Sequence, residues 1–267
     1  MIIACDLDRT LLPNGEEPDD NSLRRLYSYL TGIDHTLVYA TGRNLAMMES
    51  AYLEYDLKIP DYLIASVGTM VYKREDDGLV LDPHWITHVY KHHPAWNREV
   101  IVSALKNTEY LSLQESGVQN EFKISFYASV STEEKRVRSD IEYALQNIEG
   151  IEIIYSIDPN KNIGLVDILP TAATKLTALE YIRTSLKKEK DDVLYAGDSG
   201  NDILPLTYGY KAVLVKNARE EVKEEVLRIT REKNHSDRLY VATGSESEHG
   251  NYASGVMEGI QYFSIRK

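Results

Sequence analysis

The N-terminal stretch Met1-Ile2-Ile3-Ala4-Cys5-Asp6-Leu7-Asp8 decides the fold of this 267-residue chain. Its first five residues are an uncharged apolar run, which predicts a short buried strand. Two aspartates follow at once, so Asp6 and Asp8 come just past the carboxyl end of that strand. In open α/β sheets, ligands bind beyond this end of the strands. The stretch therefore predicts an α/β sheet with an acidic site at one edge.

Short apolar runs alternate with helical patterns in the first and last parts of the chain, which predicts βαβ units on a parallel, Rossmann-like sheet. The middle differs. Residues 85–106 read as one helical region, and residues 123–130 alternate like a half-exposed strand. We therefore expect a catalytic core of residues 1–83 and 172–267, interrupted by an inserted α+β domain of residues 84–171.

The composition excludes several classes of protein. The chain has 30 Lys+Arg against 42 Asp+Glu, a net charge of −12, which argues against a nucleic-acid surface. No apolar run is long enough to cross a membrane, the N-terminus does not resemble a secretory leader, and one cysteine makes no intrachain disulfide. We expect a cytoplasmic monomer or weak oligomer that binds neither nucleic acid nor membrane.

A second acidic pair follows another apolar run, in Gly197-Asp198-Ser199-Gly200-Asn201-Asp202. Loops at the same edge of the sheet would bring Asp198 and Asp202 to Asp6 and Asp8. Clustered carboxylates repel one another, and a divalent cation relieves that repulsion. Because carboxylate oxygens favour Mg²⁺ over zinc, the sequence predicts a magnesium site.

The remaining polar markers suit a phosphoryl group. Thr41 and Gly42 end a predicted strand with a hydroxyl and an accessible N–H, both able to donate to a phosphoryl oxygen. Lys175 lies near the start of a predicted helix, where an anion is stabilised. Asp6 is a possible nucleophile, since carboxylates form acyl phosphates. Asp8 could protonate the leaving oxygen and later activate water.

These motifs resemble, in order, the four motifs of the haloacid dehalogenase (HAD) superfamily: residues 6–10, Thr41, Lys175 and residues 197–202. The long insertion resembles that superfamily's α/β cap. Further stretches make the chain similar to the sucrose-phosphate phosphatases: Ser66-Val67-Gly68-Thr69, Trp85 and Trp96, Phe122-Lys123-Ile124-Ser125-Phe126, Asp167-Ile168-Leu169-Pro170 and Asn217-Ala218-Arg219-Glu220-Glu221.

The resemblance implies a role for each matching residue. Asp6 would be the nucleophile and Asp8 the acid/base. The implied magnesium ligands are Asp6, the main-chain carbonyl of Asp8, and Asp198, with Asp202 in or beside the coordination sphere. Thr41, Gly42, Lys175 and Asn201 would hold the phosphoryl group, and on the cap Lys123 would grip the sugar. We add Gln119 as a weaker sugar contact.

Three features depart from this pattern or stand outside it. Position 9 is Arg, where such enzymes often have Gly or Asn, and its side chain either contacts substrate or faces solvent. Lys175 lacks the Gly-rich neighbourhood expected around it, which leaves the exact sugar phosphate open. His84, His88 and His92 are spaced to share a helix face and could bind zinc, although a helix-surface or cap-interface role is expected.

The motifs together with this resemblance imply a Mg²⁺-dependent phosphatase for a small sugar phosphate, such as the disaccharide phosphate sucrose 6-phosphate. Phosphatases for mannosylfructose phosphate or mannosyl-3-phosphoglycerate are alternatives, as is a non-catalytic sugar-phosphate-binding module. A phosphosugar mutase would need an Arg-rich cap to hold a second phosphate. Residues 84–171 carry 8 Lys+Arg and 12 Asp+Glu, which argues against the mutase.

Overall fold

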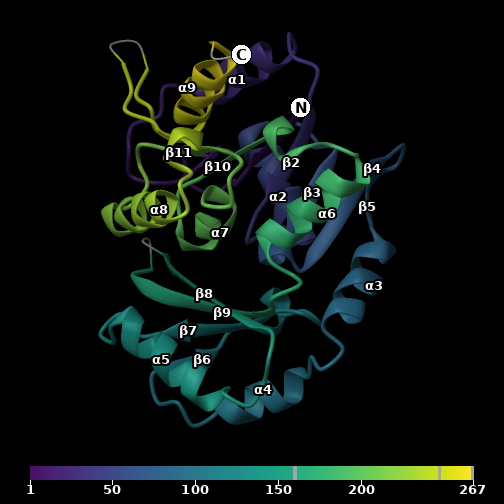
Figure 1. The fold of residues 1–267 in the computed structure, drawn as a ribbon, viewed down its shortest axis with the longest axis vertical. Coiled ribbons are helices and arrows are strands. Elements are labelled where there is room, and N and C mark those ends of the chain that lie inside the picture. Colours follow the sequence, from purple (N-terminus) through teal and green to yellow (C-terminus); the bar gives the residue numbers. More distant parts are fainter. Residues whose placement is uncertain (159–160, 246–247, 266–267) are drawn as a thin grey trace.

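The computed structural model describes residues 1–158, 161–245 and 248–265. Within these residues, a central eight-stranded sheet has the order β12-β11-β10-β1-β2-β3-β4-β5 (Figure 1). The strands from β12 to β3 are parallel, and β4 and β5 form an antiparallel edge. The expected α/β fold with a mostly parallel central sheet is confirmed. The strand bounds are β1 (Ile2–Cys5), β2 (Thr36–Ala40), β3 (Tyr62–Ala65), β4 (Met70–Glu75), β5 (Gly78–Leu81), β10 (Val193–Gly197), β11 (Lys211–Leu214) and β12 (Leu239–Val241).

Helices cover both faces of this sheet. Strand β1 explains why, because all four of its residues are buried and they alternate between two cores. Ile2 and Ala4 face α6 (Lys175–Ser185), α7 (Ile203–Leu206) and α8 (Glu220–Glu232), whereas Ile3 and Cys5 face α1 (Ser22–Leu30), α2 (Leu45–Tyr55) and α9 (Tyr252–Ile265). A strand buried on both faces reads as a continuous apolar run, as this one does.

A second, antiparallel sheet has the order β6-β7-β9-β8 and lies between β5 and α6 in the chain. Its strands are β6 (Leu111–Leu113), β7 (Ile124–Ala128), β8 (Ile151–Asp158) and β9 (Ile163–Pro170). Helices α4 (Arg98–Leu105) and α5 (Glu134–Ala144) cover the face turned away from the central sheet (Figure 1). We call this unit the cap. Its elements, from α4 to β9, lie within residues 84–171, whose assignment as an inserted domain stays a prediction.

The single helical region predicted over residues 85–106 is wrong in one respect, because two helices form there. Helix α3 (Pro83–His92) ends shortly before Pro94, whose ring removes a backbone N–H. Asn97 then caps α4, accepting a hydrogen bond from the N–H of Val100 at 3.1 Å. The short strands β5 and β6 were not anticipated either. Five short 3₁₀ turns complete the described elements: η1 (Ser66–Gly68), η2 (Ser116–Val118), η3 (Lys190–Asp192), η4 (Gly200–Asp202) and η5 (Ser236–Arg238).

None of the helices in the described residues is both long and apolar enough to cross a membrane.

Candidate active site

Three neighbouring parallel strands bring the predicted site residues to one edge of the central sheet. β1 lies between β10 and β2, so Asp6, Asp198 and Thr41 follow three adjacent strands. The chain then turns sharply, because the Leu7 carbonyl accepts hydrogen bonds from three successive N–H groups, those of residues 10–12. This turn keeps Asp6 and Asp8 at the carboxyl edge instead of continuing the strand.

Lys175 reaches the same edge from the first turn of α6. Thr174 caps this helix, its hydroxyl accepting from the N–H of Thr177 at 3.2 Å. The helix end packs on the η1 turn, where Gly68 has a φ of 111° and a Cβ would lie 2.1 Å from the Thr174 carbonyl carbon. Only glycine therefore permits this approach. Beside it, Val67 holds a φ of 64°, a strained backbone for a β-branched residue.

The Lys175 ammonium is the centre of the site. Its Nζ donates hydrogen bonds to Asp6 Oδ1 and Asn201 Oδ1, both at 2.6 Å, and to Asp202 Oδ1 at 2.8 Å. The side chain is only 1% exposed. Burial opposes its charge, but Asp202 and Asp6 outweigh burial and raise the pKa of Lys175 above its ordinary value. The lysine is therefore a fixed cation beside the carboxylates.

Asp6, Asp198 and Asp202 form a buried acidic trio. Each offers an oxygen, and these oxygens lie within 4.8 Å of one another. Burial, followed by the neighbouring Asp202, raises the pKa of Asp198 to about 7, and burial likewise raises the pKa of Asp6 well above its usual range. Buried carboxylates with unfavourable charge, offering hard oxygen ligands, fit a divalent cation such as Mg²⁺. The trio could therefore hold the predicted metal.

The Asp202 carboxylate is already fully engaged. Its Oδ1 accepts from Lys175 and from the Tyr195 hydroxyl. Its Oδ2 accepts from the N–H groups of Asp198 and Ser199 at 3.2 and 3.1 Å and from the Ser199 hydroxyl at 3.2 Å. This geometry favours a place for Asp202 beside the metal, where it orients Lys175 and shapes the loop that carries Asp198.

Asp8 is held by two residues that sequence reasoning missed. Arg43 donates from Nε to both Asp8 oxygens, at 3.1 and 3.0 Å, and from Nη2 to Oδ1 at 2.6 Å. Asn14 donates to Asp8 Oδ1 at 2.6 Å. Arg43 directly follows Thr41-Gly42 and was within reach of motif reasoning, whereas nothing in the sequence marks Asn14. Together they fix the orientation of the carboxylate at the mouth of the site.

The cap presents a second polar group to the site. Lys123 is 5% exposed, and its Nζ lies 3.3 Å from Asp167 Oδ1. The Ser125 hydroxyl donates to the same Asp167 oxygen at 2.6 Å. Gln119 is placed differently, since its amide bonds to the backbones of Gln114 and Ser125 and to Arg98. The sugar contact predicted for Gln119 therefore has no support from this arrangement.

A cavity of about 380 Å³ extends from the carboxylates at the edge of the central sheet to the Lys123–Asp167 pair of the cap. The cap closes onto the core beside it: a Cβ at Gly200 would lie 2.2 Å from the Tyr155 carbonyl oxygen, and Asn44 Nδ2 donates to the Gly117 carbonyl at 2.7 Å. The lining includes Asp6, Asp8, Gly42, Arg43, Met47, Val67, Asp198 and Asn201 from the core, and Gln114, Val118, Lys123, Tyr127, Ile157, Lys161, Leu165 and Asp167 from the cap. Thr41 is buried next to Gly42, and its hydroxyl accepts from the Arg43 N–H at 3.1 Å.

Among the residues that the structure describes, the three α3 histidines join no group of three or more candidate metal ligands. The rings of His88 and His92 pack together with centroids 4.1 Å apart, and His88 also stacks on Trp85. In the part of the chain that the structure describes, the acidic trio is the group of three or more candidate ligands that converges.

Comparison with known proteins places this chain in a family. A family model for sucrose-6F-phosphate phosphohydrolases matches residues 1–264. The chain belongs to this family. Its members are phosphoric monoester hydrolases of the HAD superfamily, as the motifs had indicated.

Three relatives illustrate the family match. A HAD-like hydrolase of Nitrosococcus oceani is 36% identical over 98% of this chain and 71% of its own length. The mannosylfructose-phosphate phosphatase of Agrobacterium fabrum is 26% identical, covering 99% of this chain and 97% of its own. The structure of the sucrose-phosphatase from Synechocystis sp. PCC6803, solved with sucrose and phosphate, has 26% identity and a TM-score of 0.82 over 99% of this chain and 98% of its own. The chain spans about 60% of the length of the plant sucrose-phosphatases it matches.

Proposed function

We propose that this chain is a Mg²⁺-dependent phosphatase for a disaccharide phosphate such as sucrose 6-phosphate. One observation carries the proposal: a single cavity is lined by Asp6, Asp8 and Asp198 at one end and by the buried Lys123–Asp167 pair at the other. The buried Lys175 ammonium lies directly behind the first end, 2.6 Å from Asp6 Oδ1. The first end suits a phosphoryl group and the second suits sugar hydroxyls. A volume of about 380 Å³ lies within the usual range for small-molecule pockets.

The proposed chemistry divides between two carboxylates. Asp6 attacks phosphorus, forming a new P–O bond as the bond to the sugar oxygen breaks, and Asp8 gives that oxygen a proton. Asp8 then takes a proton from water, which attacks phosphorus and releases Asp6. Lys175 neutralises charge on the phosphoryl oxygens, the contribution that usually dominates phosphoryl transfer. A bound Mg²⁺ would add positive charge at the same oxygens.

The cap supports selection of the leaving group. The Lys123–Asp167 pair is buried but lines the cavity, so both charged groups are available to sugar hydroxyls with little water competing. Asp167 is further fixed by Ser125. The cap contacts the core at Gly200, beside the cavity, which would limit the access of bulk water to the phosphoenzyme.

Mannosylfructose phosphate is the second candidate substrate, favoured by the Agrobacterium relative that matches along nearly its whole length. Mannosyl-3-phosphoglycerate carries an extra carboxylate, and among the described lining residues Lys161 and Arg9 are the cations outside the pairs already described. A non-catalytic binding module would not need the Lys175 and Asp8 networks. Cytoplasmic location and a monomeric or weakly oligomeric state remain predictions from the sequence.

A substrate panel tests the proposal. Phosphate release with Mg²⁺ is measured for sucrose 6-phosphate, mannosylfructose phosphate, mannosyl-3-phosphoglycerate, glucose 6-phosphate and fructose 6-phosphate. We expect the highest kcat/KM for a disaccharide phosphate. Lys123→Met should raise KM for that substrate but not for p-nitrophenyl phosphate, while Lys135→Met, an exposed lysine on α5, should change neither. Equal rates across the panel would remove the disaccharide claim, and tight binding without turnover would favour the binding module.

A further inference from the structure

Arg9 occupies a backbone conformation that does not suit it. Its φ is 60°, in the left-handed region where glycine and asparagine are favoured over other residues. The catalytic scheme above does not use its side chain. A disfavoured residue within the loop that carries Asp6 and Asp8 points to a role for the guanidinium itself.

Several contacts hold that guanidinium rigidly. Nη2 donates to Glu17 Oε1 at 2.8 Å and to the Asn217 carbonyl at 3.0 Å. The backbone is fixed as well, since the Arg9 N–H donates to Asn14 Oδ1 at 2.8 Å and Asn217 Nδ2 donates to the Arg9 carbonyl at 2.7 Å. Asn217 is in turn held by the Tyr252 N–H. The position of the charge is therefore built into the fold.

The Arg9 charge faces the acidic trio. Its Nε lies 3.5 Å from Asp198 Oδ2, and only 16% of its side chain is exposed. Among the described residues, the trio's carboxylates form ion pairs with Lys175 and Arg9. Lys175 bonds to Asp6 and Asp202, so Arg9 is the cation assigned to Asp198. The Asp198 carboxylate also accepts from the Thr10 hydroxyl at 3.0 Å.

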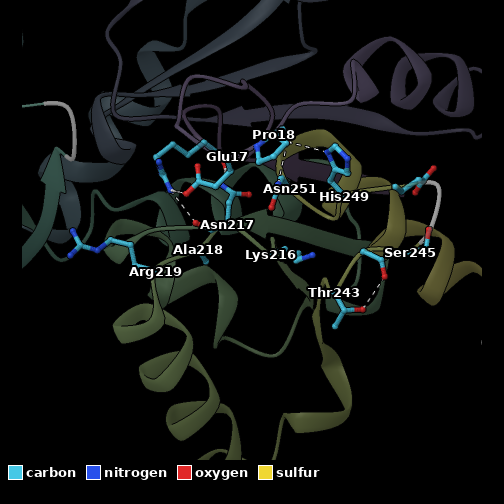
Figure 2. A pocket seen from close by; sticks show the side chains of 13 residues that line it. Glu17, Pro18, Lys216, Asn217, Ala218, Arg219, Thr243, Ser245, His249 and Asn251 are labelled. Atoms are coloured by element: carbon cyan, nitrogen blue, oxygen red, sulfur yellow. Dashed lines mark hydrogen bonds and ion pairs between the residues drawn. The ribbon is translucent and has the colours of Figure 1, made fainter.

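The other side of Arg9 lines a second cavity, of about 650 Å³. Figure 2 shows Glu17 and Asn217 side by side on its wall, with Asn251 next to them. Glu17 is the counter-charge of Arg9 and also accepts from the Tyr252 hydroxyl at 2.9 Å. Arg9 thus stands between a carboxylate of the catalytic cleft and a carboxylate of this outer cavity.

We propose that Arg9 is a positioning residue for the metal site: its fixed charge beside Asp198 lowers the affinity of the acidic trio for a divalent cation, and Glu17 moderates that effect. A cation binding at Asp198 must share the carboxylate with the guanidinium, and like charges repel. Occupancy of the site then follows the free Mg²⁺ concentration instead of being permanent. This inference rests on the proposed magnesium-dependent function.

The test measures metal affinity directly, without substrate. Mg²⁺ is titrated into the metal-free protein by calorimetry, and Mn²⁺ binding is followed by electron paramagnetic resonance. Arg9→Asn should fold, because asparagine tolerates the left-handed backbone. It should bind both metals about three- to tenfold more tightly, as expected for removing one charge a few ångströms away in a largely water-like dielectric. Arg9→Lys keeps the charge and should restore most of the wild-type affinity.

For a second variant we expect the opposite effect on metal affinity. Glu17→Gln removes the counter-charge of Arg9 and should weaken metal binding about two- to threefold. Arg219→Asn, an arginine of the same outer cavity with 44% side-chain exposure, should leave affinity unchanged. Unchanged or weaker binding in Arg9→Asn would overturn the proposal for Arg9 alone. Failure of the wild-type protein to bind either metal would instead overturn the magnesium-dependent function.

Discussion

Replacing Lys175 with methionine tests the electrostatic logic of the site most directly. The substitution keeps most of the buried aliphatic volume but removes the ammonium that contacts Asp6, Asn201 and Asp202. The acidic trio would then be left buried without its central cation. Two effects follow: the protein should lose stability without metal, and it should lose catalysis with or without metal.

The expected loss of unfolding free energy follows from the burial of Lys175. Removing one partner of a buried ion pair typically costs about 3–5 kcal/mol, and Lys175 is 1% exposed with two carboxylates in contact. For a protein of this size, that corresponds to a fall in Tm of roughly 10 °C. A divalent cation at 100 times its Kd returns about 2.7 kcal/mol by mass action. Added Mg²⁺ should therefore recover much of the lost stability but not the activity.

The assay is urea unfolding followed by circular dichroism, with EDTA and with saturating Mg²⁺, beside a phosphate-release measurement. Lys233→Met, at an exposed position just past α8, is the matched control and should behave as wild type in both conditions. A Lys175→Met protein as stable in EDTA as wild type would show that the trio does not depend on this cation. Turnover restored by Mg²⁺ would refute the direct role of Lys175 at the phosphoryl group.

Three further predictions concern the carboxylates. Asp6→Asn should abolish phosphate release while circular dichroism stays unchanged, and a persisting turnover would exclude Asp6 as nucleophile. Chelating the divalent metal should raise the Kd for the sugar phosphate by about tenfold or more, because the bare trio repels it; calorimetry with and without EDTA checks this. In the metal-free protein, the raised pKa of Asp198, about 7, contributes stability that is fully present below its unfolded pKa near 4 and is lost as the pH rises to about 7. Relative to Asp198→Asn, the unfolding free energy should therefore fall between pH 4 and pH 7, whereas a difference independent of pH would contradict the burial argument.

The sheet and the acidic edge could be predicted because their signals are local. Strand β1 is buried on both faces, so its sequence is a continuous apolar run, and Asp6 stands out at its end. The same holds for β10 and Asp198. Once three strands are parallel neighbours, their carboxyl ends must coincide, and Lys175 joins them from the start of α6.

The networks around these residues could not be predicted, because they join distant parts of the chain. Arg43 stands out by its place after Thr41 and Gly42, but nothing in the sequence shows that it pairs with Asp8, 35 positions away. Likewise, nothing shows that Asn217 pairs with Arg9, 208 positions away. Gln119 is a second example of side-chain partners that the sequence does not reveal. Its role as a weaker sugar contact stays a prediction; in the folded cap its side chain hydrogen-bonds to Arg98 and the Ser125 backbone, partners that the sequence does not show.

The net charge of −12 would suggest that this protein avoids phosphorylated ligands. That inference fails because a surface charge is screened beyond a Debye length of about 10 Å, whereas a buried charge a few ångströms from the ligand is not. In the proposed function, a phosphoryl group at the sheet edge would lie near the buried Lys175, with Arg9 and Arg43 already paired to Asp198 and Asp8. Whether the local charge is positive or negative therefore depends on whether a metal ion is bound to the acidic trio. An acidic protein can bind a phosphate ester when its nearest carboxylates are matched by buried cations and by a bound metal, and Arg9 is where this chain adjusts that balance.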